Sequence, residues 1–255
     1  MTDSEKSNAQ PVLECLSLSK RYGGLDAVKD ISLRIKPGER RAIIGPNGAG
    51  KTTFFRLISG EVEATSGSIR LFGRDCTRMP PYKRTAIGLG RTFQITNLFN
   101  TMTVMDNLVL AAIGLKRLKY SIHRNLASYK EVYAHARMIL ETVGMSDKRD
   151  VVITGLSYGE QRQIEIALAL VSDPQILLLD EPTAGLSPAD SAMMARMIHN
   201  LDPALTILII EHNMDVAFQV ADCITVLHQG SVFAEGCQPD ISNNLQVQAI
   251  YFGTE

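Results

Sequence analysis

Apolar positions along this chain form short continuous runs, separated by segments in which apolar residues recur at helical spacing. The runs at 41–45, 176–180 and 206–212 have the length of strands and are largely apolar. Such runs are typical of strands buried on both faces of a parallel sheet. Segments 51–59 and 187–201 show the helical spacing. The alternation predicts an α/β fold around a mostly parallel sheet.

Several further segments carry a pattern that predicts antiparallel strands. Residues 13–35 alternate in pieces on either side of a Gly-Gly turn, and residues 66–73 resemble part of a hairpin. Segments 223–230 and 231–236 are expected to form a closing hairpin. We therefore expect an antiparallel β subdomain next to the parallel sheet.

A helical block interrupts this pattern from about residue 86 to residue 171, and we expect an inserted α-helical subdomain at about 94–171. The core is then expected at about 11–93 and 172–240, with a tail at 241–255; the whole of 11–255 forms one domain, and the polar residues 1–10 are expected to be disordered. Within the block, one apolar stripe is predicted to end at Gly144 and consists of Val132, Tyr133, Ala136, Ile139, Leu140 and Val143.

Composition narrows the functional classes. The net charge is −1, whereas proteins that bind nucleic acid usually carry an excess of basic residues. The four cysteines lie far apart, which predicts reduced thiols and no metal cluster. The first ten residues do not resemble a signal peptide, and no apolar run reaches the roughly 18 residues that span a bilayer. A membrane role would therefore depend on a partner.

The strongest motif is Gly45-Pro46-Asn47-Gly48-Ala49-Gly50-Lys51-Thr52, which matches G-x-x-x-x-G-K-[ST] at every fixed position. Its glycines let backbone N–H groups approach phosphate oxygens, and the next helix, with Thr53 in its first turn, directs its positive end at them. Lys51 is suited to the β/γ-phosphates, and the Thr52 hydroxyl to Mg²⁺. An accidental glycine-rich turn is the alternative, but the preceding strand and following helix favour a P-loop NTPase (RecA-like) core that binds ATP.

A second candidate group follows the apolar run at 176–179. Asp180 in this position is typical of a residue that holds Mg²⁺, and Glu181 of one that orients or deprotonates the attacking water. A solvated Asp-Glu-Pro turn is the alternative. The upstream phosphate-binding motif makes the catalytic interpretation preferable.

The segment Leu156-Ser157-Tyr158-Gly159-Glu160 predicts a capped helix start, because Ser157 and Glu160 have the spacing of a capping box. Its place shortly before the acidic strand also resembles the signature of the ABC ATPases, usually written L-S-G-G-Q. The sequence departs from that signature at Tyr158 and Glu160.

The resemblance covers nearly the whole chain and implies further roles. Tyr22 in "KRYGG" looks like the aromatic that stacks on adenine, Gln94 in "GRTFQ" like the glutamine that contacts Mg²⁺ or water, and His212 in "LIIEHN" like the histidine near the γ-phosphate. Together with Glu181, Gln94 and His212 are the expected catalytic residues; Thr52, Gln94 and Asp180 are the expected magnesium ligands. Ser187 stands where many relatives carry Asp, and we expect it to cap a helix that starts at Pro188.

The resemblance also implies partners. It predicts a head-to-tail dimer with an identical or homologous ATPase subunit, in which Ser157 and Gly159 of one chain face the ATP bound by the other. Integral membrane permease subunits would hold the chain at the cytoplasmic side of the inner membrane as a peripheral protein, and no nucleic acid is expected as a partner.

The stretches "GRTFQITNLFNTMTVMDNLVLAA", "LSYGEQRQIEIALAL" and "ILIIEHNMDVAFQVADCITVLHQGSVFAEG" resemble the ATP-binding subunits of bacterial branched-chain amino acid importers. Nothing in the chemistry of this chain selects the transported substrate, so the ATP-binding subunits of urea or amide importers and of lipopolysaccharide exporters remain alternatives.

Three further classes of protein also carry a phosphate-binding loop of this kind. They are soluble ABC ATPases that act on nucleic acid, nucleotide sensors without turnover, and ordinary P-loop kinases. The presence of only one phosphate-binding motif in the sequence argues against the first class. The presence of both Glu181 and His212 argues against a nucleotide sensor without turnover. The signature segment argues against an ordinary P-loop kinase, which would not need it.

Overall fold

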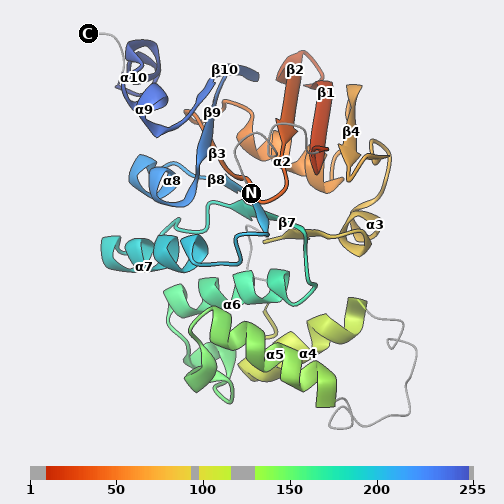
Figure 1. The fold of residues 1–255 in the computed structure, drawn as a ribbon, viewed down its shortest axis with the longest axis vertical. Helices are drawn as coiled ribbons and strands as arrows, with labels where there is room; N and C mark the ends of the chain where they lie inside the picture. Colours follow the sequence, from red (N-terminus) through yellow and green to blue (C-terminus); the bar gives the residue numbers. More distant parts are fainter. Residues whose placement is uncertain (1–9, 93–97, 116–129, 253–255) are drawn as a thin grey trace.

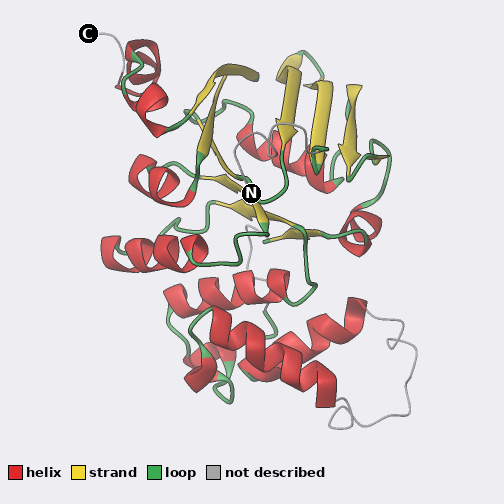
Figure 2. Ribbon diagram, viewed as in Figure 1, coloured by secondary structure: helices red, strands yellow, loops and turns green. Residues whose placement is uncertain are grey.

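The computed structural model describes residues 10–92, 98–115 and 130–252 and contains two sheets (Figures 1 and 2). The larger sheet has six strands in the order β10-β9-β3-β8-β7-β6. All neighbours in it are parallel except the antiparallel edge pair β9–β10. Its strands are β3 (Arg40–Ile44), β6 (Leu89–Arg91), β7 (Ile176–Asp180), β8 (Thr206–Ile210), β9 (Cys223–His228) and β10 (Ser231–Gly236). The predicted mostly parallel sheet and closing hairpin are confirmed.

The smaller sheet is antiparallel, with strands in the order β2-β1-β4-β5. They span β1 (Leu13–Tyr22), β2 (Leu25–Ile35), β4 (Ser66–Leu71) and β5 (Arg74–Asp75). The turn between β1 and β2 is Gly23-Gly24, as predicted, and Phe72-Gly73 forms the turn of the β4–β5 hairpin with positive φ at both residues.

The central strands β3, β7 and β8 are buried at every position, and their side chains alternate between two cores. In β7, Leu177 and Leu179 join the core on the helical side. Ile176 and Leu178 join the other core, shared with the antiparallel sheet and α2 (Lys51–Ser59). This alternation follows from the two-residue period of a strand, and it explains why both faces of these strands carry apolar residues.

The remaining helices include a group that packs against one face of the parallel sheet, below it in Figure 1. In that group, α5 (Lys130–Thr142) and Val143 directly after it carry the predicted stripe: five of its six residues are buried and Tyr133 is partly buried. Beyond α2, the helices are α3 (Pro81–Ala86), α4 (Val104–Leu115), α5 (Lys130–Thr142), η3 (Ser146–Lys148), η4 (Ile153–Gly155), α6 (Tyr158–Leu170), α7 (Pro188–His199), α8 (Met214–Val220), α9 (Gln238–Ser242) and α10 (Leu245–Phe252). No described helix combines the length and apolar content needed to cross a bilayer.

Strand β6 corrects the expectation that helical structure starts at about residue 86. Its three residues pair in parallel with the start of β7 and form the edge of the larger sheet. Three residues are too few to display a strand period. Close packing supports the strand, because a Cβ on Gly90 would lie 2.9 Å from a side-chain carbon of Pro174.

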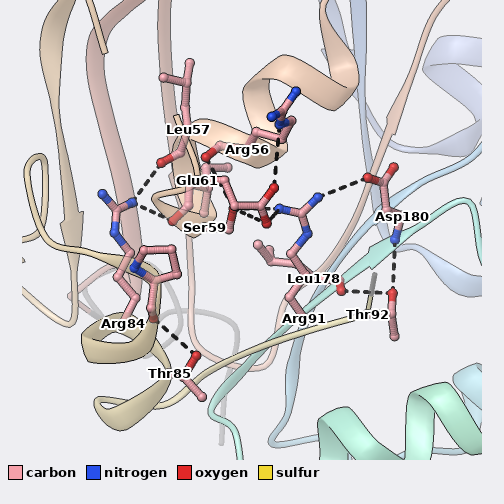
Figure 3. A network of polar contacts seen from close by, with 12 residues as sticks. Arg56, Leu57, Ser59, Glu61, Arg84, Thr85, Arg91, Thr92, Leu178 and Asp180 are labelled. Atoms are coloured by element: carbon pink, nitrogen blue, oxygen red, sulfur yellow. Dashed lines mark hydrogen bonds and ion pairs between the residues drawn. The ribbon is translucent and has the colours of Figure 1, made fainter. Parts of the chain in front are cut away.

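Arg84 ties α3 to the C-terminal end of α2, and its side chain is among the most deeply buried of the described residues (Figure 3). Its guanidinium donates hydrogen bonds to the carbonyls of Leu57 (2.8 Å), Ile58 (2.6 Å), Met79 (2.8 Å) and Thr77 (3.3 Å). Two of these carbonyls belong to the last turn of α2, where the regular i+4 partners of a helix are missing. Arg84 therefore fixes the end of α2 that lies opposite the glycine-rich loop.

We predict that Arg84→Met lowers the free energy of unfolding by about 3 kcal/mol, because it removes the hydrogen bonds that a buried guanidinium donates to four backbone carbonyls. Urea unfolding measures this loss. Lys83→Met is the matched control, since Lys83 is exposed on the same helix and should change stability by less than about 0.5 kcal/mol. Equal losses in the two variants would contradict this role of Arg84.

Candidate functional site

The candidate residues meet at one edge of the larger sheet. Strands β3, β7 and β8 are parallel neighbours, so the segments after Ile44, Leu179 and Ile210 leave the sheet on the same side. In open α/β sheets this carboxyl edge is where ligands bind. The glycine-rich loop and the histidine follow β3 and β8, whereas Asp180 is the last residue of β7 and Glu181 comes directly after it. These groups lie together for this reason.

The glycine-rich loop depends on backbone conformations that favour glycine. Gly45, Gly48 and Gly50 have φ values of 150°, 77° and 98°. Gly50 is the N-cap of α2, and no side chain caps that helix start, so its first N–H groups are available to a ligand. Uncapped N–H groups and the positive end of the helix dipole together favour an anion. The predicted helix from Lys51 to Ser59 and its C-cap Gly60 are both confirmed.

Lys51 is buried at the base of this loop. Its Nζ donates hydrogen bonds to the carbonyl oxygens of Gly45 (2.6 Å) and Pro46 (3.1 Å). Burial lowers the pKa of Lys51, while the nearby carboxylates of Glu181 and Asp180 oppose that shift. The ammonium group is therefore held against the loop in a place where phosphate oxygens would be favourable partners.

Glu181 and His212 face one another across the ends of β7 and β8. His212 Nε2 lies 2.8 Å from Glu181 Oε1. Glu181 has φ of 50°, an uncommon conformation for a residue other than glycine, and its amide donates to Ile210 O at 3.0 Å. Such conformations persist where the surroundings hold them, often at functional sites.

The turn after Glu181 is anchored by the buried Glu211. Glu211 Oε1 accepts hydrogen bonds from the Thr183 amide (3.2 Å) and hydroxyl (2.8 Å). Burial raises the pKa of Glu211, and the bonds from Thr183 oppose the shift. Glu211 thus joins the end of β8 to the turn after β7, and it helps to keep Glu181 and His212 at a fixed spacing.

Asp180 ends β7 with a fully buried side chain. Its Oδ2 lies 3.3 Å from Arg91 Nη2, whereas its buried Oδ1 has no hydrogen-bond partner among the described residues. Burial raises the pKa of Asp180, and the Arg91 guanidinium opposes this shift. A carboxylate oxygen left unpaired at this depth fits a divalent cation, because Mg²⁺ prefers oxygen ligands.

A cleft of about 570 Å³ opens over these groups. Tyr22, at the end of β1, lines it together with Glu181, His212 and the loop-helix segment 47–53. Lys20 Nζ lies 5.0 Å from the centre of the Tyr22 ring. The structure therefore brings the predicted aromatic, most of the phosphate-binding loop and two of the predicted catalytic residues, Glu181 and His212, to one cavity. Gly45, Pro46 and Asp180 do not line it.

Ser157 and Gly159 do not line this cleft and lie at the start of α6. The predicted capping box is present: the Ser157 hydroxyl accepts from the Glu160 amide, and the Glu160 carboxylate accepts from the Ser157 amide. Tyr158 is about half exposed, and its hydroxyl lies 3.3 Å from Ala184 O in the turn after β7. Ser187 is the N-cap of α7, and Pro188 is the first residue of that helix, so the expected cap is confirmed.

One predicted site residue is not described by the structure, and two residues at the site were not predicted from the sequence. Gln94 lies outside the described residues. Gln229 lines the cleft and has φ of 50°, but the sequence signals it only by a following glycine. Arg91 was missed as well, although a charged residue in the apolar surroundings of "GLGRTF" was a usable signal.

Comparisons with known proteins agree with this geometry. The family model described as "ABC transporter" matches residues 28–184. The "High-affinity branched-chain amino acid transport ATP-binding protein LivG" of Escherichia coli (strain K12) is 37% identical over 254 residues, covering 96% of this chain and 99% of the relative.

Two solved structures extend the comparison. The ADP conformation of an ATP-binding cassette of an ABC transporter has a TM-score of 0.85 at 28% identity, covering 96% of this chain and 100% of that one. A dimeric ATP-binding cassette in a post-hydrolysis state, bound to ADP and Pi, has a TM-score of 0.74 at 25% identity, covering 88% of this chain and 98% of that one. The expected P-loop core is confirmed by these likenesses.

We predict that Gly45→Ala destabilises the chain more than Gly48→Ala does. Both residues have positive φ, which costs a side chain about 1 kcal/mol. A Cβ at Gly45 would in addition collide with the carbonyl oxygen of Leu227, whereas at Gly48 nothing lies within 4 Å. Urea unfolding without nucleotide should show an extra loss of at least about 1 kcal/mol for Gly45→Ala. A loss no greater than that of Gly48→Ala would refute the collision.

Proposed function

We propose, from the premise that this chain belongs to the ABC transporter family, that it energises the import of branched-chain amino acids through a membrane permease. The chain is an ATP-binding and ATP-hydrolysing transporter subunit. The cargo rests on one observation, the 37% identity to a relative named for branched-chain amino acid transport along almost the full length of both chains.

Hydrolysis is assigned to Glu181 and His212. The Glu181 carboxylate accepts a proton from the attacking water, and His212, at 2.8 Å, holds that carboxylate beside the cleft. The N–H groups at the start of α2 and the Lys51 ammonium bind the phosphates.

Magnesium is assigned to Asp180, Thr52 and Gln94. The unpaired Oδ1 of Asp180 supports this choice, and Thr52 lies in the first turn of α2. A Mg²⁺ ion held by these residues together with ATP would supply positive charge beside the phosphates. The Asp180 carboxylate and the Thr52 hydroxyl would supply oxygen ligands to it.

A head-to-tail dimer would place Ser157 and Gly159 opposite the cleft of a second ATPase subunit. Three observations support it: these residues lie at the start of α6 away from their own cleft, Ser157 is exposed, and a similar cassette is described as dimeric. Such a dimer would accept an identical or a homologous partner chain. The amides at the start of α6 that the capping box does not use would meet the terminal phosphate from the far side.

The permease is assigned to the helical part of the chain. We place this subdomain at about 94–171, the core at about 11–93 and 172–240 and the tail at 241–255. Gln94 at the boundary would transmit changes in the cleft to the permease contact. The subunit would then work as a peripheral protein on the cytoplasmic side of the inner membrane.

We predict that Glu181→Gln keeps ATP binding but lowers the ATPase rate at least about 100-fold, because it removes the proton acceptor. Fluorescent-nucleotide binding and phosphate release measure the two properties, and size-exclusion chromatography with ATP should show dimers that persist. The exposed Asp202→Asn is a control with the same type of change. Undiminished turnover in Glu181→Gln would refute the assignment of Glu181.

We predict that cells lacking this chain lose uptake of labelled leucine, and that the wild-type chain restores it while Glu181→Gln does not. The loss follows because the permease would have no source of ATP energy. Leucine uptake that never depends on the chain would overturn the cargo and leave the ATPase assignment standing; uptake of urea, the next alternative, would then be measured.

A further inference from the structure

Two consecutive residues at the end of the edge strand β6 hold the last residue of β7. The Thr92 hydroxyl oxygen lies 3.4 Å from the Asp180 amide nitrogen and accepts its hydrogen bond. The preceding residue, Arg91, places Nη2 at 3.3 Å from Asp180 Oδ2. The backbone and the side chain of Asp180 are thus each tied to the end of β6 (Figure 3).

The other end of the Arg91 guanidinium is anchored at the end of α2, by its last residue and by Glu61 just beyond it. Its Nη1 donates to the Ser59 hydroxyl at 2.6 Å and to the Glu61 carboxylate. Only about 10% of the Arg91 side chain is exposed, so these charge-assisted bonds form with little competition from water. Arg91 therefore connects Asp180 to the segment that ends the phosphate-binding helix.

This arrangement leaves the two oxygens of Asp180 unequal. Oδ2 is occupied by Arg91, while Oδ1 is buried and has no partner among the described residues. A carboxylate without such an anchor can turn about its last bond and exchange its oxygens. With Oδ2 fixed, Oδ1 is the oxygen that stays free for a ligand.

We propose that Arg91 is a positioning residue for the magnesium site, which fixes Asp180 through Oδ2 so that Oδ1 is presented to Mg²⁺. The proposal rests on the magnesium assignment made above for Asp180. Partners that orient a metal ligand typically contribute 10- to 100-fold to metal affinity. A planar guanidinium suits this role, because it can contact Asp180 and Glu61 at once through different nitrogens.

The test compares binding of a fluorescent ATP analogue with Mg²⁺ and with EDTA. In the wild type Mg²⁺ should strengthen binding, and Arg91→Met should reduce this strengthening by about tenfold while changing binding in EDTA less than about twofold. Arg91→Gln, which retains hydrogen-bonding groups but no charge, should show the same loss and serves if the methionine variant fails to fold.

Arg56→Met is the matched control. Arg56 is about half exposed and lies 3.6 Å from the same Glu61 carboxylate, and the structure records no contact between it and Asp180. Its removal deletes the same charge at the same helix end and should leave the effect of Mg²⁺ unchanged. Thermal unfolding of each variant without nucleotide shows that the fold is intact.

The outcomes distinguish the role of Arg91 from the magnesium assignment itself. If Arg91→Met weakened nucleotide binding equally with Mg²⁺ and with EDTA, Arg91 would have only a structural role and the proposal would be overturned. It would also be overturned if Mg²⁺ strengthened binding by the same factor in Arg91→Met as in the wild type. An effect of Mg²⁺ that is absent already in the wild type would instead overturn the magnesium assignment. Loss confined to the Mg²⁺ measurement supports Arg91 as the positioning residue.

Discussion

Charge buried at the carboxyl edge of the parallel sheet is the constraint on which the rest of this structure depends. Lys51, Asp180 and Glu211 are all within 5% of complete burial, and an isolated buried charge is costly. Each is balanced locally: Lys51 by two loop carbonyls, Asp180 by Arg91, and Glu211 by the amide and hydroxyl of Thr183. The positions of the strand ends, the turns and the edge strand β6 all follow from these pairings.

The sequence was sufficient for much of the site because the ligand-binding groups follow buried strands. The loop at 45–52 and the pair Asp180-Glu181 each come directly after an apolar run, and parallel strands carry their C-terminal ends to one edge. A local motif could therefore be placed in space without knowledge of its contacts. The helix caps were equally predictable, since Ser157 and Ser187 each bond to a residue three positions later.

What the sequence could not supply are contacts between distant segments. Arg91 meets Asp180 across 89 positions and Ser59 across 32, and Arg84 meets Leu57 across 27. No periodicity encodes such pairings, and a three-residue strand such as β6 is too short to be recognised. Tyr158 is similar: its departure from the usual signature was visible, but its position beside Ala184, 26 residues away, emerged only in the fold. These missed contacts all involve long polar side chains.

The strict alternation along β7 has a consequence for how this protein can tolerate insertions and deletions. Asp180 continues the phase of Ile176 and Leu178, so it points toward the side of the sheet that holds α2. One residue gained or lost within the strand would exchange the two cores and turn Asp180 toward the helical side, away from Arg91. Insertions and deletions should therefore be tolerated in the connections between elements and not within the five residues of β7.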